Sequence, residues 1–259
     1  MAQAMKLMTE GVQVAIVGNR LVASTENILI GGALSACGMP AVLEFRYNTL
    51  EKPLTWNPSH PTYAGVDWSI KNLFEIKACQ YALIEGNYLR RSWPDGQAGA
   101  AFLIKAESYG NGATIGYTSN VIVRWNQIED AGFGLNIAGV DNVDAKHAPV
   151  NVWSYGNSYE IGAQYFSAVD NPFLGFGLLS NCGSIHDTFV SLGTVNKITI
   201  LPGVPDLATS LGLIDSIFGA TSFGIKGDGT TSGTDSLNTY APGYDVKGCV
   251  FVGQNSATY

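Results

Sequence analysis

The amino-acid sequence predicts an all-β protein folded as a parallel β-helix, a solenoid of about eight rungs with long loops. Composition is the first observation behind this prediction. Charged residues make up 14% of the 259 residues and 31 residues are glycine, against usual values of ~25% and ~7%. The second is a series of short stretches in which apolar and polar residues alternate. The third is an asparagine that returns in a similar context every ~30–40 residues, a spacing typical of repeat architectures.

One position in each repeat carries this asparagine, which gives way to other residues in the last three units: Asn19, Asn48, Asn87, Asn126, Asn157, Asp187, Ser216 and Cys249. At a bend between strands, a stacked asparagine can donate its side-chain amide to a carbonyl of one neighbouring rung and accept an N–H from another. We therefore expect a structural ladder at this position, worth about 1 kcal/mol per residue. Regularity should weaken from Asp187 onward, and His186 is expected at a rung turn.

Apolar columns flank the ladder position and predict strands with one buried face. Residues three and five places before it are mostly apolar, while the residue between them varies, which is the period of two of a strand. The residue two places after it is always large and apolar: Leu21, Leu50, Leu89, Ile128, Tyr159, Phe189, Phe218 and Phe251.

A second short strand is expected in each unit. Its predicted inward pairs are Ile28/Ile30, Phe74/Ile76, Phe102/Ile104, Leu135/Ile137, Phe176/Leu178, Ile198/Ile200 and Phe223/Ile225. Glycine-rich corners connect strands that belong to different columns of the repeat, whereas a hairpin turn would connect two neighbouring strands of one sheet. This connection favours winding around one axis over an up-and-down barrel.

We expect residues 1–259 to form a single domain and to be a segment of a longer chain, because the first repeat begins almost at the N-terminus. Met1 to Glu10 lack the charged region and apolar stretch of a signal peptide. No apolar run approaches the ~18 residues of a membrane span, so no span is expected. A net charge of −7 without a cluster of Lys and Arg argues against nucleic acid as a partner.

No cofactor or metal site is expected. The cysteines lack metal-ligand spacing and are predicted to lie in the interior: Cys37, Cys79, Cys182 and Cys249. Asp228 and Asp235 lack the spacing of a calcium loop, so calcium is not indicated, although loop carboxylates leave it open.

Two segments carry a family resemblance. WSIKNLFEIKACQYALIEGNYLRRSWPDGQAGAAFLI (68–104) and GIKGDGTTSGTDSLNTYAPG (224–243) resemble a little-characterised branch of the bacterial right-handed parallel β-helix proteins of the pectin-lyase-like superfamily. The resemblance implies a right-handed winding and an extracellular or periplasmic protein. Members of the superfamily are commonly polysaccharide lyases and hydrolases, so it also implies a polysaccharide partner, acidic ones included. Chains of this group usually extend further at both ends.

The loop from Arg90 to Gly99 is the first candidate binding site. In RRSWPDGQAG, Trp93 could stack on a sugar ring, while Asp95 and Gln97 could bond its hydroxyls. The alternative is that Pro94-Asp95-Gly96 is simply a turn.

The second strands supply the other candidate site. If Phe74/Ile76 and Phe102/Ile104 face inward, then Glu75, Lys77 and Lys105 face outward, with the lysines side by side on successive rungs. Adjacent like charges require neutralisation, either by Glu75, Asp95 and Glu107 or by an acidic sugar.

Two chemistries would use these residues. In a lyase, Lys77 or Lys105 would abstract the proton next to a uronate carboxylate while the other cation stabilises the enolate. In a hydrolase, Glu75 and Asp95 would flank the glycosidic bond. The alternative is a charge ladder that only keeps the face soluble. Arg46, Glu85 and Arg124 occupy one outward column with alternating sign on three successive rungs, and we expect them to form an ion-pair ladder without a further function.

The sequence therefore favours a carbohydrate-directed protein of one of two kinds. One is a polysaccharide lyase or glycoside hydrolase acting in an outer-face groove beside the 90–99 loop. The other is a non-catalytic polysaccharide-binding or surface-adhesion module. A purely structural rod is a third interpretation. An enzyme requires two titratable groups with opposed pKa shifts near one sugar, whereas a binding module requires aromatic platforms without them.

Overall fold

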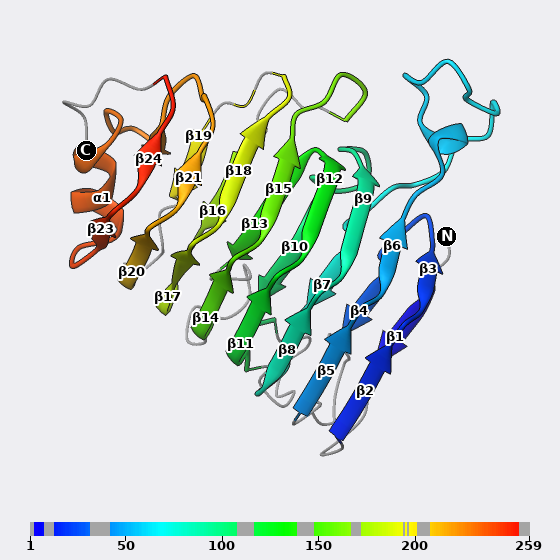
Figure 1. Cartoon of the computed structure of the whole chain (residues 1–259), viewed down its shortest axis with the longest axis horizontal. Helices are drawn as coiled ribbons and strands as arrows, with labels where there is room; N and C mark the ends of the chain where they lie inside the picture. Colours follow the sequence, from blue (N-terminus) through cyan, green and yellow to red (C-terminus); the bar gives the residue numbers. More distant parts are fainter. Residues whose placement is uncertain are drawn as a thin grey trace.

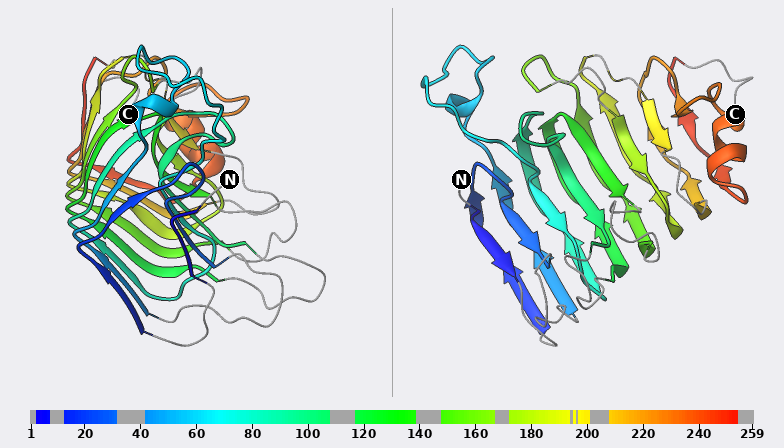
Figure 2. Two further views of the ribbon diagram at one scale, coloured as in Figure 1. Left: turned by 90° about the vertical axis from the view of Figure 1, so that its right-hand side faces the viewer. Right: turned by 180° about the vertical axis from the view of Figure 1, so that it is seen from behind.

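The computed structural model describes residues 3–7, 13–31, 42–107, 117–138, 148–166, 172–193, 195, 197–200 and 208–253. The chain is a right-handed parallel β-helix in which every rung contributes one strand to each of three parallel sheets. Figure 1 shows the rungs stacked in sequence order from the N-terminal to the C-terminal end. The left view of Figure 2 is turned by 90° and looks along the stack, so that successive rungs overlap. The predicted solenoid is confirmed.

Each sheet has eight strands. Sheet A comprises β1 (Met5–Leu7), β4 (Ile28–Ile30), β7 (Phe74–Ile76), β10 (Ala100–Lys105), β13 (Phe133–Ala138), β16 (Pro172–Phe176), β19 (Lys197–Ile200) and β22 (Ile225–Gly227). Sheet B comprises β2 (Gln13–Val17), β5 (Val42–Arg46), β8 (Ala82–Glu85), β11 (Ser119–Arg124), β14 (Val150–Tyr155), β17 (Ser180–Ile185), β20 (Thr209–Ile214) and β23 (Asp245–Lys247). Sheet C comprises β3 (Arg20–Val22), β6 (Thr49–Glu51), β9 (Tyr88–Ser92), β12 (Gln127–Ala131), β15 (Ser158–Ile161), β18 (Thr188–Ser191), β21 (Ile217–Phe218) and β24 (Val250–Phe251).

Two short helices lie outside the sheets. The 3-10 helix η1 (Leu54–Trp56) belongs to the long connection between β6 and β7, which projects from the N-terminal half of the solenoid (Figure 1). Helix α1 (Thr234–Tyr240) lies beside β22 at the C-terminal end, with Leu237 buried against the core.

Inward-facing side chains of successive rungs stack along the solenoid axis. In sheet C the rings of Tyr159, Phe189, Phe218 and Phe251 lie nearly parallel, with neighbouring centroids 4.5, 5.0 and 5.0 Å apart. Such stacking follows from the parallel register, which places each inward residue directly over its counterpart one rung earlier. The predicted apolar columns therefore form the core.

The cysteines agree with the prediction where the structure describes them. Cys79 and Cys182 are buried, Cys249 is half-buried, and all three are free thiols. Cys37 lies outside the described residues.

Two predicted inward pairs are wrong. In β16 the pair is Leu174 and Phe176, not Phe176 and Leu178, because all five residues of the strand are buried and no alternation sets its register. In the last rung Ile225 begins β22, and Phe223 stays 51% exposed. Sheet C also makes a third strand per rung, of which the sequence showed only a single apolar column.

The asparagine ladder runs along the bend between sheets B and C. The backbone N–H of Asn48 donates to Oδ1 of Asn87 on the next rung at 2.9 Å, and Nδ2 of Asn48 donates to the Ile16 carbonyl on the rung before at 2.9 Å. Asn87, Asn126 and Asn157 repeat both contacts at 2.7–3.0 Å. The bend would otherwise leave these buried backbone groups unpaired. The predicted structural role is confirmed.

The residue before each ladder position has a left-handed backbone, with φ between 47° and 72° at all eight rungs: Gly18, Tyr47, Gly86, Trp125, Gly156, His186, Asp215 and Gly248. This conformation turns the chain from sheet B into sheet C. His186 therefore lies at a rung turn, as predicted.

Asp187 is the first ladder residue that cannot copy asparagine. Its Oδ1 accepts from the Asn157 backbone at 2.7 Å and its Oδ2 from the Ser184 hydroxyl at 2.6 Å, but it has no amide to donate. Burial raises the pKa of Asp187 to about 6, although these hydrogen bonds favour the charged form. On the later rungs Ser216 accepts from the Asp187 backbone and the Cys249 thiol donates to the Leu213 carbonyl at 3.2 Å. The ladder thus continues with weaker donors.

We expect Asn87→Ala to lower the free energy of unfolding by about 2–4 kcal/mol, because it removes contacts to both neighbouring rungs and leaves buried polar groups unpaired. Urea denaturation measures this loss. Asn19→Ala is the matched control, since Asn19 is exposed on the first described rung of the ladder and its loss should cost clearly less. Equal effects of the two substitutions would contradict the buried ladder as the source of stability.

We expect Asp187→Asn to stabilise the protein at pH 7. Between its ordinary pKa of 3.8 and the raised value of about 6, folded Asp187 keeps a proton that the unfolded chain has lost, so stability falls as pH rises through this window. The shift corresponds to a cost of roughly 3 kcal/mol above pH 6. Thermal unfolding at pH 4 and pH 7 should show the gain at pH 7 only. Asp215→Asn, an exposed neighbour, should show neither effect, and a gain at both pH values would refute the charge as its cause.

Candidate functional site

Three connections meet at the corner between sheets C and A and enclose a small pocket. The corner pocket has a volume of about 160 Å³ and is lined by Asn57, Pro58, Ser59, Trp93, Pro94, Asp95 and Tyr165. Its residues follow strands β6, β9 and β15 of sheet C, where β6 and β9 are neighbours and β15 lies two rungs beyond β9. The solenoid thus brings together residues more than 100 positions apart in the sequence.

Asn57 joins two of these connections. Its backbone N–H closes η1 by donating to the Leu54 carbonyl, and its Nδ2 donates to the Tyr165 carbonyl at 2.7 Å. Its Oδ1 accepts from the Ser59 backbone at 2.9 Å, which turns the chain at the pocket rim. One buried amide therefore holds both the rim and the opposite wall.

An aromatic cluster supports the pocket from below. Trp93 packs against Ile70 and Phe166, with 6.2 Å between the Trp93 and Phe166 ring centroids. The His60 and Tyr165 rings meet edge to face at 4.8 Å. Trp93 was predicted to stack on a sugar, but only 5% of the residue is exposed because these neighbours cover it. Trp93 lines the pocket without offering a free ring face.

Asp95 and Gln97 point in different directions from the same loop. Asp95 is exposed, and its Oδ2 accepts from the Ile70 backbone at 2.7 Å. Gln97 turns away from the pocket, and its Oε1 accepts from Asn72 Nδ2 at 2.9 Å. Asn72 in turn donates to Glu75 Oε2 at 3.2 Å. Of the two residues predicted to bond sugar hydroxyls, only Asp95 lines the corner pocket.

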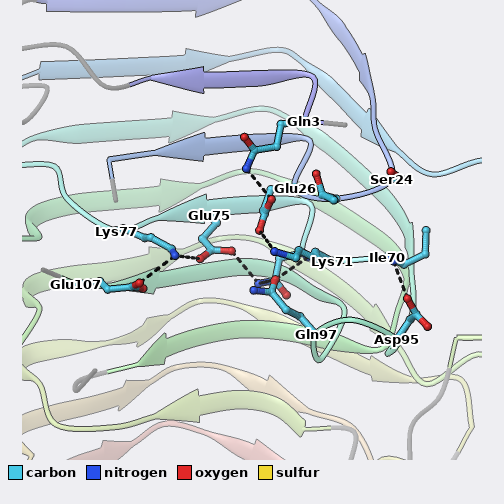
Figure 3. A network of polar contacts seen from close by, with 12 residues as sticks. Gln3, Ser24, Glu26, Ile70, Lys71, Glu75, Lys77, Asp95, Gln97 and Glu107 are labelled. Carbon is cyan, nitrogen blue, oxygen red and sulfur yellow. Dashed lines mark hydrogen bonds and ion pairs between the residues drawn. The ribbon is translucent and has the colours of Figure 1, made fainter. Parts of the chain in front are cut away.

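The predicted lysine pair lies in an ion-pair network on the outer side of sheet A, of which Figure 3 shows Lys77 with Glu75 and Glu107. Strands β7 and β10 place Ile76 opposite Ile104, so Lys77 and Lys105 follow on successive rungs as predicted. Lys77 Nζ lies 3.0 Å from Glu107 Oε1 and 3.6 Å from Glu75 Oε1, and Lys105 pairs with the other Glu107 oxygen. Carboxylates of the protein therefore neutralise both lysines.

Glu75 faces outward but has no exposed surface, which the alternation of the strand did not predict. Burial raises the pKa of Glu75 and the neighbouring Glu26 raises it further, while Lys77 opposes the shift. Burial also acts to raise the pKa of Glu26, but hydrogen bonds from Gln3 and Lys71 bring it below its ordinary value. In Figure 3 Glu75 is turned toward Lys77 and Asp95 toward Ile70, so the structure does not bring these two carboxylates to one site.

Lys52 is a buried residue that sequence reasoning missed. Its side chain has no exposed surface, and Nζ donates to the carbonyls of Ala23, Ser24 and Thr25 at 3.1, 3.2 and 2.7 Å and to Asn27 Oδ1 at 3.0 Å. Burial lowers the pKa of Lys52 to about 7, and Glu26 opposes this shift. The ammonium group anchors the start of the long connection that carries Asn57 and Ser59. A lysine in a polar loop is usually exposed, so no sequence signal marks it.

Glu51, the residue before Lys52, is held as firmly. It accepts from Arg20 Nε and Arg90 Nε at 2.7 Å each, and the parallel register of β6 and β9 places it opposite Arg90. These contacts fix the end of β6 just before the chain leaves the sheet for the pocket.

We expect Lys52→Met to lower the free energy of unfolding by about 2–4 kcal/mol, because it leaves four oxygen acceptors without their donor. The connection between β6 and β7 should also become more sensitive to limited proteolysis. Lys247→Met is the matched control, since Lys247 and its partner Asp245 are both exposed, so the loss of this pair should cost clearly less. A Lys52→Met protein as stable as the wild type would disprove the anchoring role.

Metal and membrane features are absent from the part of the chain that the structure describes. No group of three or more His, Cys, Asp or Glu side chains there is placed to hold a metal ion. Asp235, in the first turn of α1, accepts from the backbone and the hydroxyl of Thr231, which precedes the helix, at 2.7 and 2.9 Å. None of the described helices has the length and apolarity needed to cross a membrane.

Comparison with known proteins adds no assignment. No protein-family model, curated protein or solved structure matches the chain.

Proposed function

We propose that the protein binds a carbohydrate and that the corner pocket takes one sugar ring. The observation that carries this proposal is the composition of the pocket wall, where the exposed Ser59 and Asp95 lie among the ring-bearing residues Pro58, Pro94 and Tyr165. Hydroxyl and carboxylate groups suit sugar hydroxyls, while aromatic and proline rings pack against the apolar faces of a sugar. Asp95 is exposed and so accessible from solvent.

The size of the pocket favours a single ring. Its volume of about 160 Å³ is below the ~300 Å³ at which drug-sized ligand pockets begin. A chain end or one sugar of a longer chain is therefore the better fit.

Binding is better supported than bond cleavage. Hydrolysis uses two carboxylates on either side of the glycosidic bond, and Asp95 is the one carboxylate among the described residues that line the pocket. Glu26 and Glu75, which lie in one network and have pKa values shifted in opposite directions, are both buried. A lyase site at Lys77 and Lys105 would first have to break their ion pairs with Glu107.

The pectin-lyase-like resemblance belongs to the same proposal. The parallel β-helix and the segments 68–104 and 224–243 support a relation to that superfamily, and with it a polysaccharide partner and an extracellular or periplasmic location. The first segment contains Trp93, Pro94 and Asp95, so the resemblance and the corner pocket meet in one loop.

We expect Tyr165→Ala to weaken carbohydrate binding about tenfold, because it removes one ring wall and leaves the backbone carbonyl that accepts from Asn57. Asp95→Asn should have a comparable effect if its charge bonds a hydroxyl. Affinity electrophoresis against pectins, alginates and neutral glycans measures both. Tyr63→Ala, in the same region but outside the pocket wall, is the matched control.

The same incubations separate binding from catalysis. Unsaturated products that absorb in the ultraviolet would indicate a lyase, and new reducing ends without them a hydrolase. Either result would replace the binding-only assignment, and binding that Tyr165→Ala and Asp95→Asn leave unchanged would remove the pocket as the site.

A further inference from the structure

A row of exposed aromatic residues follows the bend between sheets B and C. Tyr47 is 59% exposed, Trp125 55% and Tyr155 39%, and His186 is exposed on the rung after Tyr155. We call these four residues the aromatic edge. The Tyr155 and His186 rings meet edge to face at 5.5 Å.

Folding alone does not account for aromatic residues at these positions. Tyr47, Trp125 and His186 have φ of 56°, 54° and 54°, a left-handed conformation that strains a residue with a side chain but not glycine. Glycine occupies the same position on the alternate rungs, at Gly86 and Gly156. The bulky rings are also largely exposed, so little core packing offsets the strain. Strained backbone that the core does not need points to a role outside folding.

The glycines in turn make room for the rings. A Cβ atom at Gly86 would lie 2.6 Å from the Tyr47 ring, and one at Gly156 would lie 3.0 Å from the Trp125 ring. Each ring therefore leans over the next rung, and Tyr47 and Trp125 recur every second rung. At ~4.8 Å per rung this spacing is roughly 10 Å.

The outer face of sheet B beside this edge is flat and apolar. The Trp153 ring lies across Gly183 and Gly212, where a Cβ atom would approach it to 2.9 Å at either position. Ile122, on the rung before Trp153, is 43% exposed. Two glycines thus let one indole ring lie against the sheet.

Charges on this face are paired among themselves. Arg124 Nε donates to Glu85 at 2.6 Å, and Arg46 donates to Glu44 at 2.6 Å instead of to Glu85 as its column predicts. Arg124 also stacks on the Trp125 ring, 4.3 Å from its centroid. The face therefore presents little net charge and is poorly suited to an acidic partner.

A second asparagine ladder borders the opposite edge of the face. Asn151 Nδ2 donates to Asn120 Oδ1 at 2.9 Å, and Asn181 Nδ2 donates to Asn151 Oδ1 at 2.7 Å. Unlike the buried ladder, these residues are partly or fully exposed. The amides of Asn151 and Asn181 each have a second N–H, which is a donor of the kind that sugar hydroxyls accept.

We propose that the outer face of sheet B, with its aromatic edge, binds an uncharged, extended β-1,4-linked polysaccharide that runs along the solenoid axis. The rung spacing of ~4.8 Å is close to the advance per sugar of such a chain, so each rung would face one sugar. The alternation of ring and glycine then matches a two-sugar repeat, in which every second sugar presents the same face. Paired charges, flat rings and amide donors suit an uncharged glycan. This inference concerns a second surface and does not rest on the corner pocket.

The test is retention of the full chain by insoluble β-1,4-glucan. We expect the wild type to be retained and Tyr47→Gly/Trp125→Gly to bind at least about tenfold more weakly. Because glycine adopts positive φ without strain, this variant should fold as stably as the wild type, which separates lost binding from lost structure. Phe223→Gly removes an equally exposed ring elsewhere and should bind normally.

Further arms identify competing explanations. Tyr165→Ala is tested on the same glucan. Its loss of retention beside full retention of Tyr47→Gly/Trp125→Gly would assign the glucan to the corner pocket and overturn this proposal, so a failure of the corner pocket and a failure of this face give different results. No retention of the wild type, or equal retention of Tyr47→Gly/Trp125→Gly, would overturn the proposal. So would a dimer in analytical ultracentrifugation that this variant abolishes, because the face would then bind a second copy of the chain.

Discussion

The structure depends on hydrogen bonding at one bend. Where the chain turns from sheet B into sheet C, backbone groups face the interior and cannot join a sheet. Burying these groups without hydrogen bonds would destabilise the fold. On the rungs of Asn48, Asn87, Asn126 and Asn157 a side-chain amide solves this, because it donates in one direction along the axis and accepts from the other. The residue before it must adopt positive φ to present that amide inward. Ladder and turn are therefore one device, repeated at every rung.

This device is also why the fold could be predicted. A residue that contacts its own counterpart one rung away leaves a period in the sequence, and the asparagines and the column two places after them carried that period through to Phe251. Prediction failed where alternation was lost. In β16 every residue is buried, so Leu174 and Leu178 are equally plausible inward residues in the sequence, and only the pairing with β13 decides between them.

The candidate site was harder to predict because its contacts do not repeat. The adjacency of Lys77 and Lys105 follows from register, but Glu107 lies beyond the strand, and the burial of Glu75 depends on neighbours that alternation does not describe. Trp93 and Tyr165 meet through connections of irregular length, and Lys52 is buried by carbonyls that no side-chain pattern marks. Sequence singled out residues in one wall of the pocket, Trp93 and Asp95, whereas Asn57, Ser59 and Tyr165 in the other two carried no signal.

The bend also explains how one solenoid can offer two different surfaces. At each rung the ladder residue pairs the buried backbone groups, and the residue before it lies outside the core with a left-handed backbone. Any side chain at that position is therefore repeated at the spacing of the rungs. Tyr47 and Trp125 occupy that position, so the backbone sets the regular spacing of the two rings, and contacts between them do not. The corner pocket, in contrast, owes its shape to loops that the ladder does not control. The ladder gives the aromatic edge its period, and a periodic surface suits a periodic partner. Loops of irregular length form the corner pocket, and an irregular pocket suits a single group.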